Sequence, residues 1–75
     1  MQNFEIKLVS INDVKDFVNL TLKFGYDLDL VSGRYHIDAK SIMGILSLDL
    51  SKPITLVAHS DDTKQLEAEI ERFRV

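Results

Sequence analysis

The chain contains no cysteine and no tryptophan, and only three glycines and one proline among its 75 residues. Without cysteine it has no disulfide, no thiolate nucleophile and no cysteine-ligated metal site, and this absence suits a reducing compartment. Long apolar runs are missing as well. No stretch approaches the roughly 20 residues of a membrane-spanning helix, and the N-terminus lacks the basic and apolar regions of a signal peptide. We therefore expect a soluble, cytoplasmic protein.

An excess of positive charge is also absent. Nine Lys and Arg residues stand against twelve Asp and Glu residues, which gives a formal net charge of −3. No basic cluster appears, although a nucleic-acid-binding protein needs one to neutralise phosphates. Nucleic acid and membranes are therefore not expected as partners. A chain of this length forms one small domain, residues 1–75, and such a domain buries only roughly 60% of its unfolded surface.

The first third of the chain predicts one strand followed by one helix. Apolar and polar residues alternate over Phe4–Leu8, which is the period of a strand with one buried face. Over Ile11–Phe24 the apolar period becomes helical, with Ser10 and Asp13 placed to cap the helix and Gly25 placed to end it. The helix side expected to face the core carries Ile11, Val14, Phe17, Val18, Leu22 and Phe24.

Three further segments have the spacing of strands. Leu28–Leu30 and Tyr35–Ile37 alternate apolar with polar residues, and Ser32-Gly33 between them predicts the turn of an antiparallel hairpin. Pro53 interrupts the chain before Ile54–His59, an apolar run of strand length. The sequence therefore predicts four strands in all.

Two more helices complete the expected order of elements. Ser41 is placed to cap a short helix over Ile42–Leu48, and Asp62 with Gln65 forms a capping-box signal before a closing helix. The apolar face of that closing helix carries Leu66, Ile70 and Phe73. The order is β-α-β-β-α-β-α, which predicts an α+β fold: an open-faced, two-layer sandwich with a four-stranded antiparallel sheet and helices on one face.

One segment resembles a known family at the level of particular residues. Lys40-Ser41-Ile42-Met43-Gly44 followed by Ser47-Leu48 is similar to the second-helix motif of HPr, the histidine phosphocarrier of the bacterial sugar phosphotransferase system. Lys23-Phe24 and the hairpin that begins near Asp27 lie at family-like distances before it. The resemblance implies the same open-faced sandwich and protein partners such as phosphotransferase-system proteins or an HPr kinase-like protein.

The phosphate-accepting motif of HPr is not present. The family has a string like Gly-Ile-His-Ala-Arg-Pro-Ala at the start of its first helix, and an ungapped count back from Lys40 puts Ser10 at the histidine position and Asn12 at the arginine position. Asp13 and Asp16 occupy the first turns of the predicted helix, where their carboxylates would repel an incoming phosphoryl group. The resemblance therefore implies a divergent member without the phospho-accepting histidine.

The two histidines do not replace that motif. His36 falls in the third predicted strand and His59 at the end of the fourth. Neither lies in a glycine-rich phosphate loop, and their separation is not that of a local chelating pair. We expect surface or structural roles for both residues and no metal site.

The predicted helix Ile42–Leu48 has more apolar surface than a core-facing stripe needs, because its apolar residues cover over half of the helical circumference. Burying Ile45 and Leu48 would leave apolar side chains exposed to water, where they could bind a partner. In HPr proteins the matching residues form part of the partner-docking surface. The alternative is that a loop, the first helix or a self-contact covers them. The candidate partner-binding residues are Ile42, Met43 and Leu46, with Leu20 if it is exposed.

Ser41 is the candidate for regulatory phosphorylation, because it matches the serine that a dedicated kinase modifies in HPr of many Gram-positive bacteria. The alternative is a helix-capping serine that contributes about 1 kcal/mol to stability.

Three functions remain to be distinguished. The sequence favours an HPr-like regulatory or adaptor protein, related to the phosphoenolpyruvate-dependent sugar phosphotransferase system, that binds protein partners rather than transferring phosphate. The first alternative is an active phosphocarrier that uses a non-standard residue. The second is a small enzyme, but the chain shows no nucleophile–base pair and no carboxylate dyad, so neither catalytic residues nor a cofactor is expected.

Overall fold

The computed structural model describes all residues, 1–75, and has the predicted order of strands and helices. In chain order the elements are β1 (Gln2–Ile6), α1 (Ile11–Thr21), β2 (Leu28–Ser32), β3 (Tyr35–Asp38), α2 (Ile42–Leu46), β4 (Ile54–Ala58), α3 (Lys64–Ile70) and a 3-10 turn (Glu71–Phe73). None of the helices combines the length and the apolar character that crossing a lipid bilayer requires.

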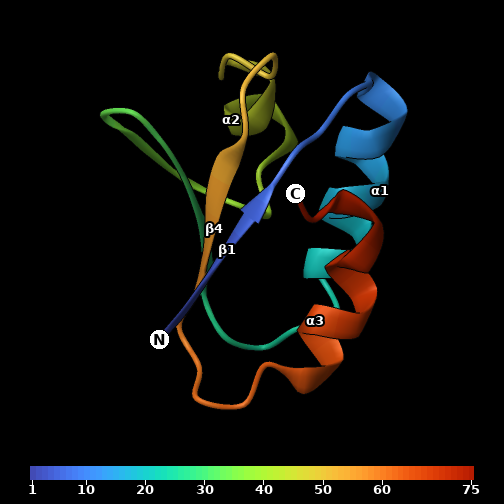
Figure 1. Ribbon diagram of the computed structural model, residues 1–75, viewed down its shortest axis with the longest axis vertical. Coiled ribbons are helices and arrows are strands. Elements are labelled where there is room, and N and C mark those ends of the chain that lie inside the picture. The colour runs from blue at the N-terminus through green and yellow to red at the C-terminus, as the bar shows by residue number, and fades with distance from the viewer.

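The four strands form one antiparallel sheet in the order β1-β4-β2-β3. Figure 1 shows α1 and α3 together on one side of this sheet, while α2 lies near the end of the sheet reached by the last residues of β1. The C-terminus returns to β1, since Val75 N–H donates to the Glu5 carbonyl at 3.1 Å. The α+β, open-faced sandwich predicted from the sequence is thus confirmed.

The core forms where the inward residues of the sheet meet the helices. Leu30 pairs with Leu56 across β2 and β4, and both are fully buried, while their chain neighbours Asp29 and Thr55 lie on the other, open face. On the helical side, the ring of Phe17 meets that of Phe73 edge to face at 5.7 Å between centroids. This pair connects α1 to the C-terminal turn and gives the two layers one continuous apolar interior.

The buried side of α1 differs from the prediction at three positions. Ile11 and Leu22 were expected in the core, but each is 61% exposed. Ile11 is the first residue of α1 and Leu22 directly follows its last, so both lie at the ends of the helix, beyond its core contacts. Leu20, which was not among the residues expected to face the core, is only 7% exposed. Helix α1 contacts α2 and α3 as well as covering the sheet, so a wider arc of its surface is buried than one apolar stripe indicates.

The hairpin turn and the first strand also differ slightly from the prediction. Ser32 pairs with Tyr35, so the turn residues are Gly33 and Arg34 rather than Ser32 and Gly33. Gly33 has a φ of 59°, and no other residue of the chain has a positive φ. This fits a two-residue hairpin turn with glycine at its first central position. The first strand begins two residues earlier than the predicted Phe4–Leu8.

The capping box expected from Asp62 and Gln65 is not formed. The closing helix begins at Lys64 after Thr63, and Thr63 makes no side-chain capping bond to the helix backbone. Its hydroxyl instead donates to Glu67 at 2.9 Å. At α1 the expected cap is present, since Asp13 N–H donates to the Ser10 hydroxyl at 3.2 Å and Val9 N–H donates to the Asp13 carboxylate at 3.0 Å.

Candidate partner-docking surface

Helix α2 is a single short turn whose ends are fixed by side chains. The Ser41 hydroxyl accepts a hydrogen bond from Gly44 N–H at 3.2 Å, and the Ser47 hydroxyl donates to the Gly44 carbonyl at 2.6 Å. A Cβ at Gly44 would lie 3.3 Å from Ile37 Cδ1, so glycine lets the turn pack closely on β3. Because Ile45 is fully buried and Leu48 nearly so, the orientation of α2 is determined by the core.

This orientation leaves the other apolar side chains of α2 at the surface. Met43 is 75% exposed and Leu46 is 43% exposed, while Ile42 is half-buried against the core. Leu20 is buried and does not belong to this surface. We call Ile42, Met43 and Leu46 the α2 patch. Ile45 and the following Leu48 are buried and Met43 and Leu46 are exposed, as the sequence predicts.

The sequence reasoning missed two exposed apolar residues around the start of α1. Val9 is 77% exposed and Ile11 is 61% exposed, and they flank the capping residue Ser10. Figure 1 shows the start of α1 at the same end of the molecule as α2. The predicted N-cap at Ser10 could have indicated their exposure. Residues beside an N-cap lie at the end of the helix, where fewer core side chains pack against them.

The start of α1 is capped and acidic, as expected from Asp13 and Asp16. Arg72, on the C-terminal 3-10 turn, lies 2.8 Å from the Asp16 carboxylate and 3.9 Å from that of Asp13. Because Ser10 accepts the Asp13 N–H group, one donor that a phosphate would need is already engaged. The Asp13 and Asp16 carboxylates thus lie beside the start of α1, and both interact with the Arg72 guanidinium.

Lys40, the first residue of the HPr-like segment, has a structural role. Its ammonium donates to the carbonyls of Phe24 at 2.8 Å and Tyr26 at 3.1 Å, in the segment that follows α1. Lysine near a helix end stabilises carbonyl groups that have no helical partner. The Lys40 side chain therefore links the segment before α2 to the segment after α1.

The two histidines meet on the open face of the sheet, 23 residues apart in sequence (59 − 36), where both contact one carboxylate. The Asp29 Oδ2 atom lies 3.0 Å from His36 Nε2 and 2.7 Å from His59 Nε2. Partial burial raises the pKa of the Asp29 carboxyl, but the hydrogen bonds from His36 and His59 outweigh it and lower the pKa below its ordinary value. No group of side chains here or elsewhere has the arrangement of a metal site.

Sequence reasoning missed this trio because a strand pattern does not reveal register. Asp29 lies on β2, His36 on the neighbouring β3 and His59 directly after β4, so only the strand order β4-β2-β3 brings them together. Both histidines lie at the surface, and their bonds to Asp29 join three strands.

Comparison with known proteins agrees with this architecture. No protein-family model matches the chain. Among solved structures, it is similar to the crystal structure of HPr-C-His from Thermoanaerobacter tengcongensis, with a TM-score of 0.79 and 25% sequence identity over 96% of this chain and 89% of that chain. The fold of this protein is therefore HPr-like, and the likeness supports a relation to the phosphotransferase system and its protein partners in general.

Proposed function

We propose that this protein is an HPr-like regulatory or adaptor module that binds a protein partner through the α2 patch and does not act as an enzyme. The observation that carries the proposal is the exposure of Met43 and Leu46 on a helix whose orientation is fixed by the buried Ile45. A flexible methionine beside branched aliphatic side chains is a common composition for a protein-binding surface. The likeness of the fold to HPr-C-His supports a partner from the phosphotransferase system.

A binding experiment with purified proteins tests the proposal. Candidate partners are the phosphate-donating enzyme of the system and HPr kinase, each titrated against the 15N-labelled chain. We expect Met43→Asp and Leu46→Asp to abolish binding to the true partner while lowering stability by less than about 1 kcal/mol, because both side chains already face water. Val75→Asp is the matched control, since Val75 is 77% exposed but lies at the C-terminus beside β1.

Two results would count against this surface. If Met43→Asp and Leu46→Asp bind as well as the wild-type chain, the partner docks elsewhere. If either variant unfolds, its side chain contributes to the core and is not a free contact.

The alternative function is a phosphocarrier that uses a non-standard residue. Incubation with phosphoenolpyruvate and the phosphate-donating enzyme, followed by mass spectrometry at neutral pH, separates the two functions. Our proposal predicts no added phosphoryl group beside a fully phosphorylated authentic HPr. An acid-labile phosphoryl group on His36 or His59 would establish the carrier instead.

We further propose that Ser41 is the site at which a kinase could regulate docking. Its hydroxyl precedes α2 directly, so a phosphate there would add negative charge beside Ile42 and Met43. HPr kinase should produce an acid-stable phosphoester that Ser41→Ala removes and that Ser47→Ala, which alters the other hydroxyl of this helix, leaves in place. Absence of labelling would leave Ser41 as a capping residue only.

A further inference from the structure

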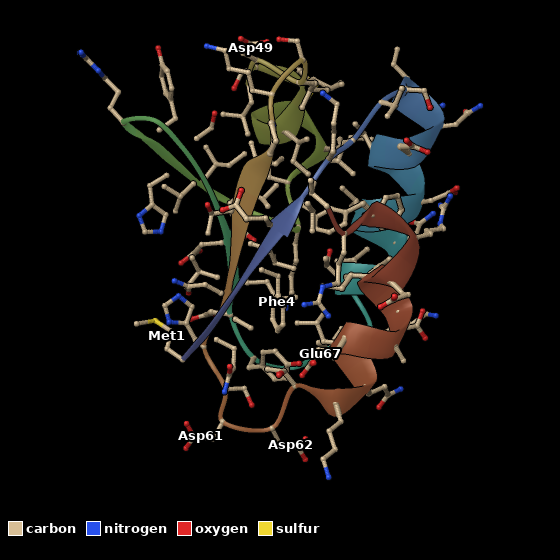
Figure 2. All side chains as sticks on the ribbon, in the orientation of Figure 1. Met1, Phe4, Asp49, Asp61, Asp62 and Glu67 are labelled. Carbon is tan, nitrogen blue, oxygen red and sulfur yellow. The ribbon has the colours of Figure 1, made fainter.

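A solvent-open hollow of about 380 Å³ lies beside the β2–β3 hairpin. Its wall on one side is the hairpin end, Ser32–Tyr35, and on the other side it is formed by Asp49, Lys52 and Pro53 from the segment that joins α2 to β4. Figure 2 shows Asp49 at the end of the molecule occupied by α2. A volume of this size lies within the range of small-molecule sites.

The positively charged side chains of this hollow have no partners within the chain. Arg34 and Lys52 both line it, and neither takes part in any of the ion pairs of the protein. Other cations are engaged: Lys23 pairs with Glu69 and Arg72 pairs with Asp16. Two cations from separate parts of the chain thus border one cavity with their charges uncompensated by an ion pair.

The hairpin adds further free donors. The N–H groups of Gly33 and Arg34 donate no backbone hydrogen bond, because they stand at the turn between the last paired residues, Ser32 and Tyr35. The hydroxyls of those two flanking residues have no partner in the hydrogen-bonding network either. Successive free N–H groups at a turn form a concave surface that attracts anions.

One carboxylate borders the hollow, and its oxygen is already engaged. The Asp49 Oδ1 atom accepts from the Ser51 hydroxyl at 2.6 Å and from Ser51 N–H at 3.1 Å. These hydrogen bonds, with the positive charges of Lys52 and Lys7 nearby, hold the pKa of the Asp49 carboxyl below its usual range. Against this single negative charge, Arg34 and Lys52 give the lining a net positive charge.

We propose that this hollow binds a small phosphomonoester, with its phosphate between Arg34 and Lys52 and its organic part against the ring of Tyr35. A guanidinium group can donate two parallel hydrogen bonds to a phosphate, and a lysine supplies a second positive charge. Tyr35 is 62% exposed and lines the hollow, so its ring offers a flat apolar surface to a sugar or a base. The site contains none of the α2 patch residues, so a test of it does not depend on the outcome of the docking experiment.

An NMR titration of the full 15N-labelled chain tests the site. The probes are inorganic phosphate, ribose 5-phosphate and adenosine monophosphate at constant ionic strength. We expect saturable shifts centred on the amides of Gly33 and Arg34, with both phosphomonoesters binding more tightly than inorganic phosphate. The double variant Arg34→Gln/Lys52→Gln should weaken binding by about 10-fold or more, because it removes both charged donors.

Lys15→Gln is the matched control, since Lys15 is an exposed lysine on α1 that forms no ion pair, and its loss should change the affinity by less than about two-fold. The spectrum of each variant without ligand shows whether it is folded. The proposal is wrong if phosphate and its esters give no saturable shift at tens of millimolar, or if the double variant binds as well as the wild type. Phosphomonoesters that bind no better than inorganic phosphate would also overturn it, because Tyr35 would then contribute nothing.

Discussion

Asp29 shows how one side chain can join distant parts of the sheet. It lies on the central strand β2, and its Oδ2 atom contacts His59 at 2.7 Å and His36 at 3.0 Å. Its side chain is 24% exposed, so these interactions are less screened than those of a fully exposed pair. The trio therefore makes stability depend on the ionisation of Asp29.

Replacing Asp29 with Asn should reveal this dependence. The pKa of Asp29 is lower in the folded protein than its ordinary value of 3.8, so its interactions stabilise the fold at pH values above that value and are lost as the pH falls through the folded pKa. We expect Asp29→Asn to lower the free energy of unfolding by about 1 kcal/mol at neutral pH, with the difference from wild type shrinking below about pH 4. Urea unfolding between pH 7 and pH 3 measures it.

Asp38→Asn is the control for this experiment, because Asp38 is the cross-strand neighbour of Asp29 but has no ion pair. A difference between Asp29→Asn and wild type that is constant over the whole pH range would contradict the assigned role of the carboxylate charge.

Residues differ in how much of their role can be predicted from the sequence. Ser10 and Ser41 cap their helices as predicted, because capping depends on neighbours three residues away. The exposure of Met43 was also predictable, since Ile45 fixes the buried side of a short helix. The burial of Leu20 was not, because it depends on other helices that pack around α1.

At the scale of elements, local signals gave the number and order of strands and helices but not all their ends. The Asp62–Gln65 signal predicted a capping box that is absent, because Thr63, one residue later, becomes the residue before the helix. The hairpin turn moved by one residue because the pairing of Ser32 with Tyr35 leaves only Gly33 and Arg34 between the strands. Strand register determines both which residues form the turn and whether the two histidines contact Asp29, and sequence periodicity does not determine register.

The hairpin should be sensitive to the conformation of Gly33. This residue has a φ of 59°, which costs other L-amino acids about 1–2 kcal/mol. We expect Gly33→Ala to reduce the free energy of unfolding by about 1 kcal/mol through backbone strain, since nothing lies within 4 Å of an added Cβ. Thermal unfolding followed by circular dichroism measures the loss.

Gly25→Ala provides the comparison, because Gly25 also has open space around it but does not have a positive φ. It should be neutral or slightly stabilising, through a smaller entropy of the unfolded chain. Equal losses for the two variants would show that strain at the turn is not the cause.

The whole molecule combines one apolar interior with surfaces of different character. The interior lies between the sheet and the helices, while the acidic and histidine side chains of the Asp29 trio lie on the opposite, open face of the sheet. In Figure 2 the labelled Phe4 lies in the middle of the molecule, between the strands and the C-terminal helix, whereas Asp61 and Asp62 lie at the end far from α2. One core thus lies between the helices and the sheet, whose other face carries the Asp29 trio.

Removing the Phe17 ring, which contacts Phe73 in this core, should destabilise the whole domain. Phe17 is fully buried and meets Phe73 edge to face, so Phe17→Ala removes both the apolar burial and the aromatic pair, at a cost of about 3–5 kcal/mol. A domain of 75 residues has a total stability of about 4–11 kcal/mol, so the variant should be partly unfolded at room temperature or melt far below the wild type. Ile11→Ala on the same helix should lose less than about 0.5 kcal/mol, since Ile11 is 61% exposed. Urea titrations of both variants measure the difference, and comparable losses at the two positions would mean that the helix does not present Phe17 to the core.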